Sequence, residues 1–235
     1  MPTRRQFLQG TAAAGATALA AGAAAAAPLA VPAPPTLTPD EALQRLIDGN
    51  REFLRSGTGS TLTGAQRRLD LAQAQAPIAA YVSCSDSRVP PEVLFGRGLG
   101  ELFIIRNAGN TIDTVALGSI EYAVGPLLVP LVVVMGHERC GAVAAAVAVV
   151  ETNATFPGSS IGAMVEPIIP AVLSVRGKAG DLLDNSVRAN VSRQVRKLRT
   201  ATDPLMLEPQ RAGTLKVVGA YYDLDTGEVD FFDRP

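Results

Sequence analysis

Apolar residues along the chain recur either at helical spacing or in short continuous runs. Between Thr38 and Gly57 the spacing is helical, and the segment Thr38-Pro39-Asp40-Glu41 supplies an N-cap, a proline and acidic residues for a first turn. This pattern predicts a helix that ends at Gly57. The same criterion predicts helices over residues 66–75, 111–124, 140–150 and 161–175.

Short apolar runs of strand length alternate with these helices. The run over residues 128–135 is rich in β-branched residues and shows no alternation with polar ones, as expected of a strand buried on both faces. Further strands are predicted over residues 78–83, 102–106, 214–222 and 229–232. Because strands and helices alternate, the sequence predicts an α/β fold with a mostly parallel central sheet flanked by helices.

The first 39 residues are expected to lie outside this fold, as an export signal and a proline-rich linker. The segment Thr3-Arg4-Arg5-Gln6-Phe7-Leu8 precedes an Ala- and Gly-rich stretch that has no charged residue before Asp40. The paired arginines indicate twin-arginine export, with cleavage near Ala25 to Ala27 and a periplasmic destination. Alanine and glycine are too weakly apolar to favour a stable membrane span, although an uncleaved membrane tether remains an alternative. Residues 40–235 are then expected to form a single domain.

Composition narrows the choice of partners and chemistry. The chain has 21 Lys and Arg against 22 Asp and Glu, so it lacks the basic excess expected of a nucleic-acid binder, and small molecules or other protein chains are the expected partners. Apolar residues make up 47% of the chain, which is enough for a buried core. Only two cysteines and one histidine occur in 235 residues, so a site that contains all three would be conspicuous.

These three rare residues follow two predicted strands. Cys84 comes directly after the run over residues 78–83, and His137 and Cys140 come directly after the run that ends at Met135. In a parallel sheet, ligand sites form at the carboxyl ends of the strands, so the three side chains are expected to converge there. Two thiolates and one imidazole provide three ligands for Zn²⁺ and leave a fourth position open for catalysis. A Cys84–Cys140 disulfide and a closed structural zinc site are the alternatives.

Asp86 and Arg88 lie just beyond the first cysteine. A guanidinium beside a carboxylate keeps it ionised and oriented, so Asp86 is expected to accept the proton of a zinc-bound hydroxide. Asp86 is alternatively the fourth metal ligand, in which case the metal ligands would be Cys84, Asp86, His137 and Cys140. A surface ion pair without functional consequence is the third interpretation.

These motifs together resemble the β-class carbonic anhydrases. The resemblance rests on Cys84-Ser85-Asp86-Ser87-Arg88 and His137-x-x-Cys140-Gly141, with Arg106-Asn107-Ala108-Gly109-Asn110 and Ile120-Glu121-Tyr122-Ala123-Val124 between them. It extends from about Asp40 to the Tyr222–Gly227 segment. It implies a Rossmann-like fold and reversible hydration of CO₂ to bicarbonate at a zinc ion, with Asp86 and Arg88 as catalytic residues.

The resemblance also implies a substrate pocket and an assembly. A dimer or higher oligomer is expected, with the CO₂ pocket at a subunit boundary. The residues that the resemblance assigns to substrate binding are Gln75, Phe103, Ala108, Tyr122 and Gly141. Two other functions stay open on the residues alone: hydrolysis of CS₂ or COS on the same scaffold, and a non-catalytic zinc-binding or bicarbonate-sensing module that holds Asp86 on the metal.

Two anionic thiolates predict a pH dependence. They donate more charge to zinc than neutral imidazoles do, so hydroxide should form on the metal at a higher pH than with three histidines. We therefore expect CO₂ hydration by the zinc-loaded protein to rise toward alkaline pH. A flat rate profile between about pH 6 and pH 9 would contradict this expectation.

Overall fold

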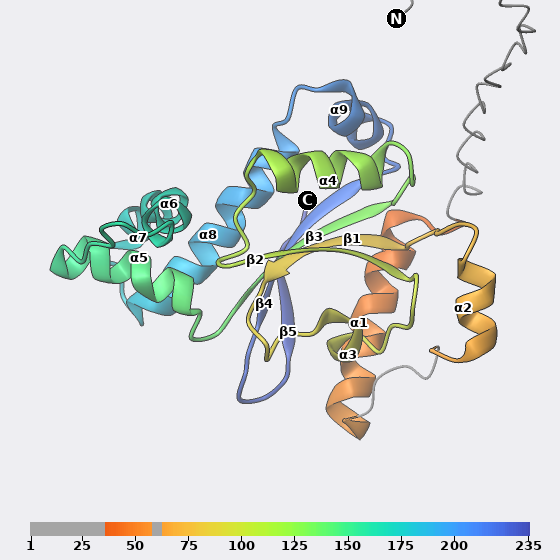
Figure 1. The fold of residues 1–235 in the computed structure, drawn as a ribbon, viewed down its shortest axis with the longest axis horizontal. Helices are drawn as coiled ribbons and strands as arrows, with labels where there is room; N and C mark the ends of the chain where they lie inside the picture. Colours follow the sequence, from red (N-terminus) through yellow and green to blue (C-terminus); the bar gives the residue numbers. More distant parts are fainter. Residues whose placement is uncertain (1–35, 58–62) are drawn as a thin grey trace, which may run out of the picture.

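Five strands form one central sheet in the order β2-β1-β3-β4-β5 (Figure 1). The computed structural model describes residues 36–57 and 63–235, so the predicted export signal and most of the linker lie outside the described residues. The strands are β1 (Ala79–Cys84), β2 (Leu102–Asn107), β3 (Leu131–His137), β4 (Lys216–Tyr222) and β5 (Val229–Asp233). Strands β1 to β4 are parallel to one another, and β5 pairs antiparallel with β4. The predicted mostly parallel α/β fold is confirmed.

Helices supply the buried clusters on both faces of the sheet. One cluster joins Tyr81 and Val133 to side chains of α1 (Pro39–Ser56), α3 (Pro91–Leu94) and α5 (Gly141–Thr152). The other joins Val82 and Val134 to side chains of α4 (Thr114–Val124), α8 (Leu182–Arg199) and α9 (Pro204–Arg211). Neighbouring residues of β1 and β3 therefore point to opposite faces, as the pleat of a strand requires. The short helices α2 (Ala65–Leu71), α6 (Ile161–Val165) and α7 (Ile169–Val175) complete the fold, with a 3₁₀ turn between α6 and α7.

The predicted start of the first helix is confirmed in detail. Thr38 Oγ1 accepts a hydrogen bond from the amide of Glu41 at 3.3 Å, and the Glu41 carboxylate accepts from the amide of Thr38 at 2.7 Å. This reciprocal pair is a capping box. Gly57 ends the helix with φ 64°, a left-handed conformation that glycine adopts without strain.

Several predicted bounds differ from the structure, among them the helix expected from residue 111, which begins at Thr114, and prolines account for two of the differences. The strand expected from residue 128 begins at Leu131, after Pro130, which has no N–H to contribute to the ladder. The helix expected over residues 161–175 is interrupted by the 3₁₀ turn Glu166–Ile168, because prolines at 167 and 170 remove helical donors. The helix expected to reach residue 75 already ends at Leu71.

The structure also contains α3, α8 and α9, which the sequence analysis did not predict. None of the helices in the described part of the chain is long and apolar enough to span a membrane.

Candidate metal centre

The carboxyl ends of β1 and β3 bring Cys84, His137 and Cys140 together. The two strands are adjacent and parallel, Cys84 is the last residue of β1 and His137 the last of β3. Cys140 follows three residues later and caps the N-terminus of α5. One ligand atom from each of the three residues lies within 4.8 Å of the other two, and all three residues are buried.

The imidazole of His137 is oriented by its own loop. Nδ1 lies 2.8 Å from the carbonyl oxygen of Glu138, so Nδ1–H donates to that oxygen and Nε2 carries the free lone pair. Nε2 is buried and has no hydrogen-bond partner among the described residues. A buried nitrogen that faces two thiols and lacks a partner fits a metal ligand, and the Cys-His-Cys donor set suits zinc.

The two thiols influence each other's pKa in opposite directions. The hydrogen bond from Cys140, followed by contacts with His137 and with the amide of Gly109, lowers the pKa of Cys84 to about 4. The hydrogen bond to Cys84 and burial raise the pKa of Cys140, although the first amides of α5 lower it. A second thiolate beside the first therefore needs a cation close by. Both cysteines are free, and their sulfur atoms lie 4.0 Å apart, well beyond the roughly 2 Å of a disulfide bond.

Asp86 lies at the edge of this cluster and is held by Arg88. Nε of Arg88 donates to Oδ1 at 2.9 Å, and Nη2 donates to Oδ2 at 2.8 Å. These side-chain hydrogen bonds hold the pKa of Asp86 well below its usual range. The Asp86 side chain is only 18% exposed, and Oδ2 lies 3.8 Å from Nε2 of His137. An ionised carboxylate with a fixed orientation therefore faces the ligand cluster.

Arg106 fixes the backbone that carries Cys84 and Asp86, a role that the sequence analysis did not assign. Its Nε donates to the carbonyl oxygen of Cys84 at 2.9 Å, and its Nη2 donates to that of Asp86 at 2.6 Å. Arg106 lies on β2, directly opposite Ser83 of β1, so the register of the two strands places the guanidinium. Arg106 opens the Arg106–Asn110 motif quoted from the sequence, but its hydrogen-bond partners follow only from the pairing of β1 with β2.

Glu138 connects the His137 loop to the segment after β4. Its Oε2 accepts a hydrogen bond from the amide of Leu224 at 3.1 Å, and its Oε1 accepts from Nη1 of Arg139 at 2.9 Å. Arg139 also forms an ion pair with Asp225. The Glu138 carboxylate therefore holds the loop in which its own backbone carbonyl orients His137. The sequence analysis had not assigned this role to Glu138.

The residues expected to bind substrate are only partly near this centre. Ala108 packs on the same core cluster as Cys84, and Gly141 opens α5 directly after Cys140. Phe103 packs on the cluster of the opposite sheet face, and its ring lies 6.0 Å from that of Tyr122. Gln75 is exposed after α2. Within one chain, Gln75, Phe103 and Tyr122 are therefore not brought to the three metal-ligand candidates.

Fold and site together define an α/β protein with a buried Cys-His-Cys centre at the carboxyl edge of a mostly parallel sheet. A family model described as carbonic anhydrase matches residues 79–229, which contain all three ligand candidates. Carbonic anhydrase 2 of Mycobacterium tuberculosis is 38% identical over 200 residues, covering 85% of this chain and 96% of that protein. The chain belongs to the carbonic anhydrase family.

Solved structures agree with this assignment. A tetrameric β-carbonic anhydrase from Sordaria macrospora superposes with a TM-score of 0.62 at 25% identity, over 70% of this chain and 84% of that one. A Coccomyxa β-carbonic anhydrase, solved in complex with acetazolamide, gives a TM-score of 0.61 at 27% identity, over 81% of this chain and 86% of that one.

A twin-arginine translocation signal sequence matches residues 1–21, so the chain carries an export signal.

Proposed function

We propose that Cys84, His137 and Cys140 hold a zinc ion and that this carbonic anhydrase hydrates CO₂ reversibly at that centre. The observation that carries the proposal is the buried cluster of three donor atoms within 4.8 Å, one of them the unpaired Nε2 of His137. When bound there, zinc would supply a Lewis acid that lowers the pKa of water at the site. The comparisons give no support to hydrolysis of CS₂ or COS or to a non-catalytic module.

The Asp86–Arg88 pair acts as the orienting group of this site. Both carboxylate oxygens of Asp86 are engaged by Arg88, so the carboxylate stays ionised and accepts hydrogen bonds without donating any. An ionised Asp86 can form a hydrogen bond only with a group that carries a proton. It therefore selects and orients such a group in the space beside His137 Nε2. The engagement by Arg88 favours this role over the alternative in which Asp86 is the fourth metal ligand.

The remaining substrate residues act across a subunit boundary. Tyr122 is 42% exposed in the single chain, and with Phe103 it forms an aromatic pair on the sheet face away from the cysteines. A partly exposed aromatic pair of this kind is suited to contribute to an apolar pocket in a neighbouring subunit. A homodimer or larger homo-oligomer therefore completes the site, and the Sordaria macrospora relative is described as tetrameric.

Export through the twin-arginine pathway leads to the periplasm in this proposal. That pathway carries folded proteins, so the cysteines meet zinc before they meet an oxidising compartment. A metal on both thiolates then protects them from oxidation to a disulfide.

Proton release is expected to depend on buffer. His137 is the only imidazole in the chain, it is buried, and its Nδ1–H is engaged by the Glu138 carbonyl, so it cannot shuttle protons to solvent. Stopped-flow turnover at fixed pH and ionic strength should therefore rise as imidazole buffer is titrated in. A rate that stays constant across the titration would show that the chain exports the proton by itself.

Arg106→Lys should weaken the centre without removing a ligand. Lysine cannot reach two carbonyl oxygens with a planar fork, so the backbone at Cys84 and Asp86 loses its clamp. We expect zinc affinity and CO₂ hydration to fall by about 10- to 100-fold, as for other groups that position metal ligands. Chelator competition and stopped-flow assays measure the two effects.

Arg199→Lys is the matched control for this variant. Arg199 also donates twice to a backbone carbonyl, that of Val217, but it lies on α8 away from the metal centre. Zinc affinity should be unchanged in this variant. Equal losses of zinc in both variants would mean that Arg106 supports the fold in general and has no particular role at the centre.

A further inference from the structure

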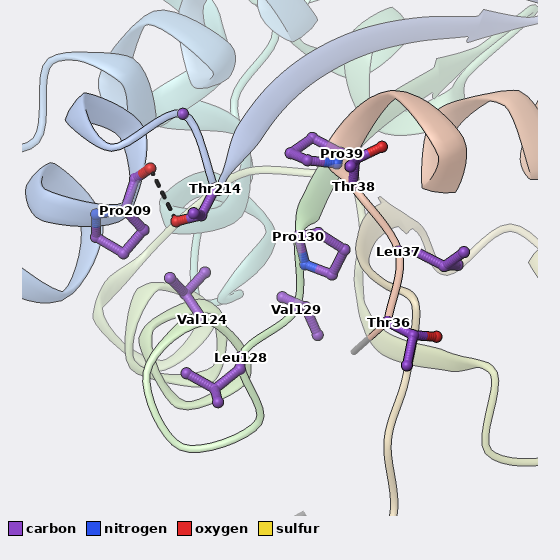
Figure 2. A pocket seen from close by; sticks show the side chains of 11 residues that line it. Thr36, Leu37, Thr38, Pro39, Val124, Leu128, Val129, Pro130, Pro209 and Thr214 are labelled. Carbon is purple, nitrogen blue, oxygen red and sulfur yellow. Dashed lines mark hydrogen bonds between the residues drawn. The ribbon is translucent and has the colours of Figure 1, made fainter. Parts of the chain in front are cut away.

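A cavity of about 500 Å³ opens at the edge of the sheet opposite the metal centre (Figure 2). Its walls come from three segments: residues 36–39 at the start of α1, the chain from the end of α4 to β3, and the chain from α9 to β4. The apolar lining side chains are Leu37, Pro39, Val124, Leu128, Val129, Pro130 and Pro209. None of the residues that line it in the described part of the chain is charged.

Hydrogen bonds hold these walls in place. The amide of Lys216 donates to the carbonyl oxygen of Pro130 at 3.0 Å, which joins the starts of β3 and β4. Thr214 Oγ1 donates to the carbonyl oxygen of Pro209 at 3.2 Å, as the dashed line in Figure 2 shows. An ion pair between Lys216 and Asp40 ties the start of α1 to the same edge. The cavity is therefore a fixed apolar groove that has few free polar groups to offer an occupant.

The chain itself supplies a segment with matching chemistry. Residues 28–35, Pro-Leu-Ala-Val-Pro-Ala-Pro-Pro, carry no charge and lead directly into Thr36 and Leu37, which are part of the wall. Four of these eight residues are prolines, which have no N–H, so burial of the segment leaves few donors unsatisfied. In a polyproline II conformation, eight residues extend about 25 Å.

We propose that residues 28–35 dock in this groove and bring the side chains of Leu29 and Val31 against different parts of its apolar lining, which includes Leu128. Because the segment is tethered at Thr36, docking is intramolecular and proceeds at a millimolar effective concentration, so modest apolar contact suffices. The groove then fixes the direction in which the export signal leaves the domain. The signal emerges at the amino ends of β3 and β4, and the metal centre at their carboxyl ends stays accessible.

A single tryptophan reports on this docking, because the chain contains none. In the zinc-loaded full chain with Val31→Trp, we expect blue-shifted emission and quenching by iodide that is several-fold weaker than for a free peptide. Adding Leu128→Asp should shift the emission to the red and restore full quenching. Leu128 is 43% exposed with φ 56°, a left-handed conformation that aspartate tolerates better than leucine, so this wall variant should still fold.

Two further variants separate docking from general effects. Leu173→Asp makes the same charge change on α7, at a position 55% exposed and outside the groove, and should leave the reporter protected. Leu29→Asp changes only the segment, cannot disturb the walls, and should release the reporter. Full iodide quenching of the Val31→Trp reporter in the otherwise unchanged chain would overturn the proposal. Emission and quenching that do not change when Leu128→Asp is added would overturn it as well. Protection that disappears on dilution also overturns it, because the occupant would then be a second copy of the chain.

Discussion

Cys140→Ser is expected to deprive the protein of its metal and to reduce CO₂ hydration to the uncatalysed background. A serine hydroxyl stays protonated at neutral pH and is a poor zinc ligand, so only Cys84 and His137 would remain of the three donors. Metal analysis of purified protein and stopped-flow CO₂ hydration test the two parts. Stoichiometric zinc together with undiminished activity would refute the proposed centre.

Ser83→Ala is the matched control for this variant. Ser83 precedes Cys84 in β1, is fully buried, and its Oγ has no hydrogen-bond partner among the described residues. Removal of this hydroxyl should leave zinc content and activity intact, since a buried hydroxyl without a partner contributes no hydrogen bond to the fold. Circular dichroism of both variants then separates loss of metal from loss of structure.

Asp86→Ala should retain zinc and still lose at least about 10²-fold in kcat, in the range found for groups that accept or orient a proton at a reacting centre. Among the described residues, Asp86 supplies the only carboxylate that lies within 4 Å of His137 Nε2, and the variant removes it. The variant also leaves Arg88 without the carboxylate that accepts its hydrogen bonds. Zinc analysis decides between the two roles of Asp86. A variant that loses zinc would identify Asp86 as a ligand, and a variant with unchanged kcat would remove it from the mechanism.

Asp225→Ala is the corresponding control. Asp225 is also a carboxylate paired with an arginine, Arg139, on the loops near the metal centre, but its side chain is 67% exposed. Exposed ion pairs contribute little, so only a small change in activity is expected. A comparable loss in both variants would indicate a general electrostatic effect of removing a carboxylate from this edge.

The sequence predicted the metal centre better than its surroundings. Cys84, His137 and Cys140 are rare residues placed directly after strand patterns, and the carboxyl-end rule for parallel sheets is enough to bring them together. The clamp by Arg106 depends on the register between β1 and β2, which no local pattern specifies. The positions of Phe103 and Tyr122 depend on which sheet face each element covers, and one sequence does not determine that.

The two longer helices that the sequence analysis missed, α8 and α9, escaped prediction for different reasons. α8 carries a buried stripe at Val187, Val191 and Val195, at the four-residue spacing that could have predicted it, but the many charged residues between them obscured the pattern. α9 is short, contains Pro209 and buries only Met206, so its apolar signal is weak. Its position follows from packing against α4 and α8, which is tertiary information.

The spacing of the three donors along the chain affects how the domain folds. His137, at the end of β3, and Cys140 lie three residues apart in the sequence, whereas Cys84 joins them only when β1 pairs with β3. An ion held by all three residues, as proposed, would cross-link two distant parts of the chain and close the loop between them. The entropy cost of closing that loop would then be part of the free energy of metal binding. Uptake of the proposed zinc ion and pairing of β1 with β3 are therefore expected to be thermodynamically coupled.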